Sequence, residues 1–154
     1  MSSPARRIAD AVSQLDPREA AASVAAAHQD ESAWLDEFAR HLDRHRTALS
    51  LARILSVWDL SQAQAARYFG VSRQALNKWL EHGVPAERAR AVADLAAATD
   101  LLVRYLKRDR ISAVVRRRAE ALGQRSLLDL LASGETRALL RSCREMFQFD
   151  GAQA

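Results

Sequence analysis

Hydrogen-bond donors gather on one side of the segment SRQALNKWLEH, which covers residues 72–82. At helical spacing, Arg73, Gln74, Asn77 and Lys78 fall opposite the apolar residues of the segment. Guanidinium, amide and ammonium groups are the donors that bind base edges and phosphates in nucleic acids. The pattern therefore predicts a helix that contacts DNA through its polar face, although an ordinary packed helical hairpin would have the same alternation.

Two other sets of side chains could support metal or nucleophilic chemistry. Glu37, His41 and His45 are spaced four apart on a predicted helix, as metal ligands can be. The sequence HLDRH, however, has Leu42 where the H-E-x-x-H metal motif has its glutamate. Cys143 is the single cysteine and stands among arginines, but no histidine follows it in the chain. We therefore expect no catalytic residue, no metal and no cofactor, and a buried structural cysteine.

The donor-bearing segment follows a turn with several mutually consistent signals. Ser61 and Gln64 form the S-x-x-Q pattern of a capping box at the start of the preceding helix. Gly70 tolerates the left-handed backbone of a tight turn, and Ser72 can cap the second helix. Ala66 is small where the two helices would cross. The inward face of the second helix is expected to consist of Ala75, Leu76, Trp79 and Leu80.

The stretch LSQAQAARYFGVSRQALNKWLEHG resembles the helix-turn-helix of Xre/Cro-like regulators. Ala66, Gly70, Val71, Leu76 and Trp79 stand where that family keeps residues of these types. The resemblance implies a recognition helix in the major groove and a homodimer on a palindromic operator in double-stranded DNA, because one such helix reads few base pairs. The residues expected to contact bases or phosphates are Gln62, Ser72, Arg73, Gln74, Asn77 and Lys78.

The composition favours an all-α fold. The 154 residues include five glycines and three prolines, and Ala, Leu, Arg and Glu dominate over β-branched residues. There is no run of 18 apolar residues, so no membrane span is predicted, and a single cysteine suits a reducing, cytoplasmic location. Helices are predicted at 4–15, 17–28, 31–45, 47–57, 61–69, 72–82, 85–107, 110–122, 126–132 and 135–147.

Charge is distributed unevenly along three predicted regions. Residues 1–45, a helical N-terminal extension, carry five arginines and eight acidic residues, a balance of −3. The remainder carries 18 basic and 11 acidic residues, a balance of +7, which suits a polyanionic partner. We expect this remainder of the chain to comprise two parts. These are a helix-turn-helix domain at 46–95 and a C-terminal module at 96–154 that mediates dimerisation or toxin binding.

A strongly basic stretch lies between residues 104 and 125. It has eight arginines and lysines against two acidic residues. It is either a second phosphate-binding surface or a solvated helix face whose arginine stems cover apolar neighbours. The residues expected to form this second basic surface are Arg108, Arg110, Arg116, Arg117 and Arg118.

The stretch LGQRSLLDLLASGETRALL, residues 122–140, resembles the C-terminal domain of Xre/MbcA/ParS-type antitoxins. The resemblance implies an antitoxin that represses its own operon and binds a RES-domain toxin, an enzyme that destroys NAD. Leu127 stands where that family usually carries proline, so a stand-alone or phage-type regulator is an alternative. A third interpretation is a helical adaptor protein without a DNA role. The residues expected to face a partner are Leu127, Leu131, Met146, Phe147 and Phe149.

Overall fold

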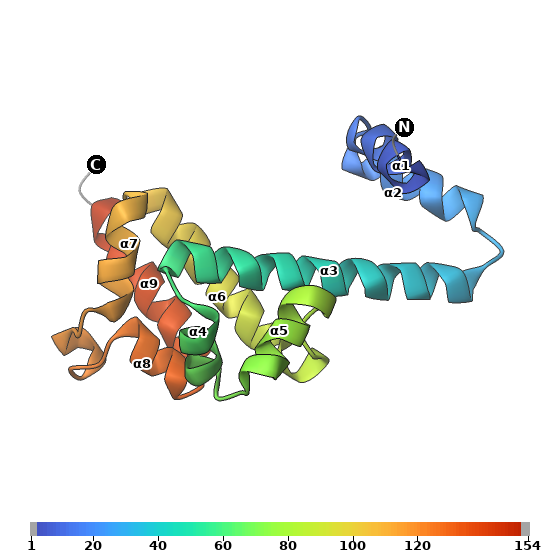
Figure 1. Ribbon diagram of the computed structural model, residues 1–154. Helices are drawn as coiled ribbons and strands as arrows, with labels where there is room; N and C mark the ends of the chain where they lie inside the picture. Colours follow the sequence, from blue (N-terminus) through green and yellow to red (C-terminus); the bar gives the residue numbers. More distant parts are fainter. Residues whose placement is uncertain (1–2, 152–154) are drawn as a thin grey trace. The chain divides into compact units, whose positions relative to one another are not determined.

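The computed structural model of the chain describes residues 3–151, with side chains up to Gln148 (Figure 1). Within these residues the regular structure is helical, apart from an isolated bridge between Ala119 and Arg125, so the predicted all-α fold is confirmed. None of the described helices has the length and apolarity needed to cross a lipid bilayer. The helices are α1 (Pro4–Ser13), α2 (Pro17–Ala27), α3 (Ser32–Trp58), α4 (Gln62–Phe69), α5 (Arg73–His82), α6 (Ala86–Tyr105), α7 (Arg108–Arg116), the 3-10 helix η1 (Glu120–Leu122), α8 (Leu127–Ala132) and α9 (Thr136–Gly151).

Most helices begin where the sequence provides a proline or a capping side chain. Pro4 and Pro17 occupy the first turns of α1 and α2, where a missing N–H breaks no intrahelical hydrogen bond. Asp16 accepts a hydrogen bond from the N–H of Arg18 at 2.8 Å and thereby caps α2. Ser126 caps α8 in the same way. Local sequence thus determines where these helices start.

The predicted helices 31–45 and 47–57 are in fact one continuous helix, α3. No glycine or proline separates them, so nothing in the local sequence breaks the helix. Thr47 instead connects the helix to a distant loop. Its hydroxyl donates to the carbonyl of Arg44 at 2.8 Å and accepts from the N–H of Val84 at 3.0 Å.

The predicted helix 110–122 is also wrong in its extent, because α7 ends at Arg116. The chain then becomes extended and forms a small loop. In this loop the N–H of Ala119 donates to the carbonyl of Arg125 at 3.1 Å, and the N–H of Gln124 donates back to Ala119 at 3.0 Å. The loop therefore has a defined shape, and it contains the 3-10 helix η1.

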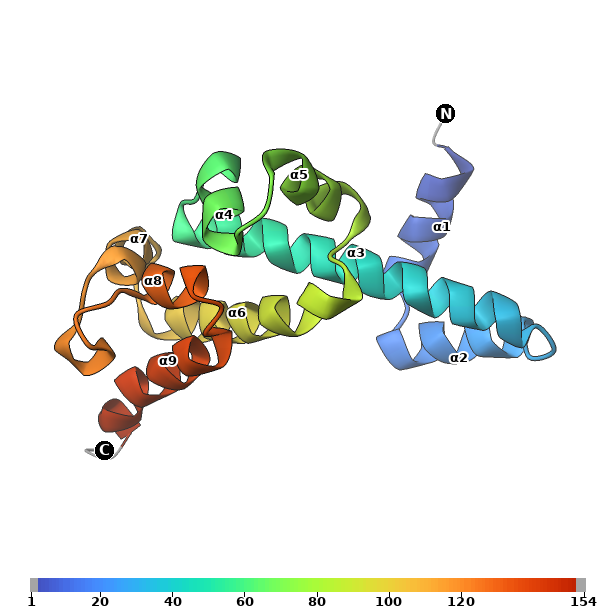
Figure 2. The ribbon, with the colours of Figure 1, turned by 90° about the horizontal axis from the view of Figure 1, so that it is seen from below.

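The chain divides into two compact units, Met1–Leu42 and Asp43–Ala154. In the second unit α6 and α9 share the most extensive contact, α4 packs on α5 and α8, and α7 packs on α6 and α8 (Figure 2). The expected boundary between 46–95 and 96–154 falls inside α6. The helix-turn-helix and the C-terminal module therefore belong to the same unit.

One hydrophobic core runs through the second unit, from the C-terminal half of α3 to α9. Trp58 is fully buried there, and its indole N–H donates to the hydroxyl of Thr99 at 3.0 Å. Thr99 in turn donates to the carbonyl of Leu95 at 2.7 Å, so these buried polar groups are satisfied. Other fully buried members are Leu51, Ile54, Leu76, Leu102, Ile111, Leu128 and Leu139.

The first unit has no comparable core. In its described part, residues 3–42, no residue is buried, so α1 and α2 are helices without a buried face. Helices of ten or eleven residues are marginal in water unless they pack against something. The packing that stabilises the second unit is therefore missing from the first.

Candidate nucleic-acid interface

The turn between α4 and α5 has the predicted local geometry. Ser61 and Gln64 form a reciprocal capping box at the start of α4, with hydrogen bonds of 2.9 and 3.1 Å. Gly70 adopts the left-handed conformation at φ 66°, which ends α4. Ser72 then accepts a hydrogen bond from the N–H of Ala75 at 3.0 Å and starts α5. Side chains close in sequence thus fix where α4 ends and where α5 begins.

The inner faces of α4 and α5 pack as expected for a helix-turn-helix. Ala65, Ala66 and Phe69 of α4 are buried, as are Leu76 and Trp79 of α5. The rings of Phe69 and Trp79 meet edge to face, with centroids 5.9 Å apart. These contacts fix which side of α5 faces solvent.

The outer face of α5 carries polar side chains. Arg73, Gln74 and Lys78 are exposed and, within the described residues, form no side-chain hydrogen bond or ion pair. Ser72 at the start of α5 and Gln62 at the start of α4 are also exposed. Five of the six residues expected to contact DNA are therefore accessible to a ligand.

Asn77 differs from the other five. Its side chain is half-buried, and its amide oxygen is buried without a hydrogen-bond partner among the described residues. Asn77 therefore lies at the edge of the polar face, whereas the sequence pattern predicted that it lies on the face itself.

Arg88 of α6 positions α5, although the sequence pattern did not single it out. Its guanidinium donates to the carbonyl of Phe69 at 3.2 Å and lies 5.7 Å from the centre of the Trp79 ring. It therefore holds the end of α4 and the inner face of α5 together. Its place in the first turn of α6 gives no indication of this role, which depends on tertiary packing.

The expected second basic surface is only partly available. Arg116 donates to the carbonyls of Trp58 at 2.9 Å and Asp59 at 2.7 Å, so it secures the end of α3. Arg108 donates to the hydroxyl of Ser56 at 3.2 Å. The other three expected residues are exposed and form no ion pair within the described part of the chain: Arg110, Arg117 and Arg118.

The residues expected to face a protein partner are mostly internal. Leu127, Leu131 and Phe147 are buried in the core of the second unit, whereas Met146 is 44% exposed. The side chain of Phe149, the fifth expected residue, lies outside the described residues. Of the described four, Met146 alone is readily accessible.

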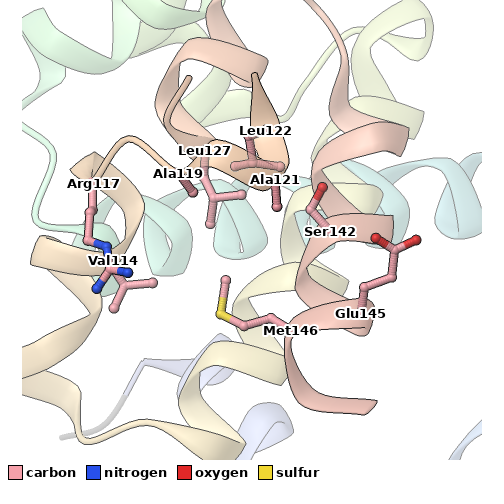
Figure 3. Close-up of a pocket in the computed structure, with 9 residues that line it drawn as sticks. All are labelled: Val114, Arg117, Ala119, Ala121, Leu122, Leu127, Ser142, Glu145 and Met146. Carbon is pink, nitrogen blue, oxygen red and sulfur yellow. The ribbon is translucent and has the colours of Figure 1, made fainter. Parts of the chain in front are cut away.

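Met146 and Leu127 line a pocket of about 440 Å³ in the C-terminal module (Figure 3). Its walls are largely apolar, and Arg117 and Glu145 lie on opposite sides, with Met146 between them. This volume lies in the range of pockets that accept small molecules or inserted side chains. The remaining lining residues are Val114, Ala119, Ala121, Leu122 and Ser142.

The residues weighed for metal or nucleophilic chemistry are not organised for it. His41 lies 3.4 Å from Glu37 on the surface of α3, and no three metal-binding side chains converge within the described residues. Cys143 is fully buried, and burial raises the pKa of its thiol to about 12. The thiol therefore stays protonated near neutral pH and is a poor nucleophile.

Comparison of the chain with protein-family models, with curated proteins and with solved structures found no match.

Proposed function

We propose that the chain is a sequence-specific DNA-binding regulator of transcription that reads the major groove with α5. The observation that supports this most directly is the exposed polar face of α5, where Arg73, Gln74 and Lys78 have no side-chain partner among the described residues. Arginine and lysine bind guanine or phosphate, and glutamine binds adenine. The turn at Gly70 and the packing of Trp79 hold this face outward.

The N-termini of α4 and α5 favour phosphate contacts beside this face. Gln62 and Ser72 stand at these ends, where backbone N–H groups and the helix dipole attract anions. Phosphate contacts fix the register of a recognition helix, while base contacts supply specificity. The same arrangement on two copies of the chain would read a palindromic operator with half-sites about 34 Å apart.

The test is binding of the full chain to a labelled duplex from its own upstream region, measured by fluorescence anisotropy at several salt concentrations. Arg73→Ala is expected to weaken binding about 10- to 100-fold and to relax the preference at one base position. Lys78→Ala is expected to weaken binding to all sequences and to reduce the salt dependence by about one phosphate contact.

A matched control is Arg90→Ala, which removes an exposed arginine from α6, outside the turn. It is expected to leave specific binding unchanged. If the wild-type chain shows no preference for its own upstream DNA, or if all three variants bind alike, α5 does not read DNA. The interpretation as a helical adaptor would then be favoured.

A second candidate function is neutralisation of a RES-domain toxin by the C-terminal module, combined with repression of the shared operon. The pocket lined by Leu122, Leu127 and Met146 favours it, because an apolar hollow can receive side chains of a protein partner. Co-expression with a RES-domain toxin from a neighbouring gene tests it. Met146→Glu is expected to abolish neutralisation and complex formation while DNA binding persists.

Val103→Glu is the control for that experiment, since Val103 is exposed on α6 and does not line the pocket. It should leave neutralisation intact. A chain that binds its operator but neither binds nor neutralises such a toxin would be a stand-alone regulator.

A further inference from the structure

The pocket in the C-terminal module has polar groups on two of its sides and hydrocarbon between them. Ser142 and Glu145 belong to α9 and lie on one side, whereas Arg117, which follows α7, lies on the other (Figure 3). Leu127 and Met146 line the space between these two sides. A molecule that fills the pocket therefore meets different chemistry at its two ends.

The α9 side of the pocket offers hydrogen-bond acceptors. The hydroxyl of Ser142 donates its proton to the carbonyl of Ala138 at 2.9 Å, so its lone pairs remain for a donor. Glu145 is exposed and forms no ion pair within the described residues, although Arg141 stands one turn before it. A carboxylate and a hydroxyl whose proton is already used both suit a cationic group that carries N–H donors.

Arg117 offers the opposite chemistry on the far side of the pocket. Its side chain is exposed and has no hydrogen bond or ion pair among the described residues. A guanidinium has donors only, and it binds a carboxylate through two parallel N–H groups. In Figure 3 the side chain lies beside Val114, away from α9. Arg117 and Glu145 thus form no pair with each other, and each is available to a ligand.

The walls of the pocket are held in place without a ligand. The loop that carries Ala119 and Ala121 is closed by the hydrogen bond from the N–H of Ala119 to the carbonyl of Arg125 at 3.1 Å. The side chain of Arg125 also pairs with Glu135, which directly precedes α9. Because Ala119 and Ala121 are small, this wall leaves the space in front of it open. A pocket formed in advance costs less conformational entropy on binding than one that a ligand must order.

We propose that this pocket binds a small zwitterion with a hydrocarbon body, an ammonium group at one end and a carboxylate at the other. The ammonium lies against Glu145 and Ser142, and the carboxylate lies against Arg117. The hydrocarbon covers Leu127 and Met146. An α-amino acid does not meet these conditions, because its two charges are attached to one carbon and cannot reach both sides. A peptide meets them less well, since its internal amide groups would face apolar walls without hydrogen-bond partners.

The first experiment titrates the full chain, without DNA, with ω-aminohexanoate, ω-aminooctanoate and ω-aminododecanoate. Calorimetry gives the dissociation constants, and the methyl resonance of Met146 shows whether the probe enters the pocket. The sequence has one other methionine, Met1, so Met146→Leu identifies this resonance. At least one chain length is expected to bind about 5- to 10-fold more tightly than the alkylamine or the alkanoate of equal length, because each of these leaves one charge of the pocket unpaired.

The second experiment reverses one charge of the pocket at a time. Arg117→Glu is expected to change the preference from the ω-amino carboxylate to the diamine of equal length, and Glu145→Lys to the dicarboxylate, each by about fivefold. Both residues are exposed, so neither substitution removes a buried contact. Arg110→Glu is the matched control and should keep the wild-type preference, since Arg110 is exposed on α7 and does not line the pocket. A gain of affinity for another probe cannot result from unfolding.

Failure of all three probes to bind the wild-type chain overturns the proposal. So does equal binding of the amino carboxylate, the amine and the alkanoate, which would make the pocket a general apolar site. Charge-reversed variants that keep the wild-type preference contradict the positions given to the two charges. The proposal goes beyond the proposed function and is tested without DNA, so the two fail separately. If a protein side chain fills the pocket instead, Met146→Glu abolishes neutralisation of the toxin although no probe binds.

Discussion

Gly70 and Gly83 both have positive φ, but the surroundings of the two glycines differ. A Cβ on Gly70 would meet nothing within 4 Å, so its role is conformational. A Cβ on Gly83 would lie 2.6 Å from the carbonyl oxygen and 2.8 Å from the Cα of Arg44. Gly83 therefore permits the close approach of α3 to the loop that follows α5, in addition to its φ of 98°.

Alanine substitutions should separate these two roles. Gly70→Ala is expected to lower the free energy of unfolding by about 1 kcal/mol, from backbone strain alone. Gly83→Ala is expected to lower it by about 3 kcal/mol, because backbone atoms must also move. Thermal unfolding followed by circular dichroism measures both. Gly134→Ala, at φ 73° with open space around it, should match Gly70→Ala; equal losses at 70 and 83 would contradict the steric argument.

Asp129 links the stability of the C-terminal module to pH. The hydrogen bond from the N–H of Ser126, at 2.9 Å, lowers the pKa of the Asp129 carboxyl below its ordinary value. Because the folded-state pKa is lower than the unfolded-state pKa, ionised Asp129 stabilises the fold above the unfolded-state value, about 3.9. This stabilisation is lost as the pH falls through the folded-state pKa.

Asp129→Asn is therefore expected to destabilise the chain by about 0.5–1 kcal/mol near neutral pH. The difference from the wild type should vanish in strongly acidic solution, where the aspartate is protonated as well. Urea unfolding across a pH series measures it. A difference that persists in acid would show that the shape of the side chain matters here and its charge does not.

At the scale of elements, the end of α3 depends on a side chain from α7. The Arg116 guanidinium spans two carbonyls, those of Trp58 and Asp59, through different nitrogens. A lysine ammonium cannot reproduce this fork. Both Arg116→Lys and Arg116→Ala are therefore expected to lower the free energy of unfolding by about 2 kcal/mol.

Arg110→Ala is the matched control, because Arg110 is exposed on the same helix. It should change stability by less than about 0.5 kcal/mol. Urea unfolding of the three variants measures the contrast. Full stability of Arg116→Lys would mean that a single contact is enough to hold the end of α3.

Local signals predicted the elements well wherever they specify a helix end. Ser61, Gly70 and Ser72 act on neighbours a few residues away, so their roles could be read from the sequence alone. The continuity of α3 could also have been inferred, since its junction lacks a breaking residue. The early end of α7 could not have been inferred from the sequence, because it depends on the hydrogen-bonded loop between Ala119 and Arg125.

The candidate site shows the same limit. Helical spacing correctly placed Arg73, Gln74 and Lys78 on an exposed face, because α5 is a regular helix with one apolar side. The partial burial of Asn77 and the contacts of Arg88 depend on the neighbouring helices. Side-chain spacing within one helix carries no information about such contacts.

At the scale of the whole molecule, both candidate sites of the second unit are built on shared packing. Leu127 lines the pocket and begins α8, and α8 packs on α4, the helix before α5. The alanine-rich sequence of α6 contains no break that would separate two domains. A displacement of α8 on partner binding would thus reach α4 through direct contact.

The two units should differ in hydrogen exchange. Amides of α6 and α9 pack around the core and should exchange only on global unfolding. Amides of α1 and α2 belong to helices without a buried face and should exchange much faster. Mass spectrometry of the exchanged chain measures both groups of helices in one experiment. Protection of α1 and α2 equal to that of α6 and α9 would mean that the first unit is stabilised by packing that its described residues do not contain, with α6 and α9 serving as the internal reference.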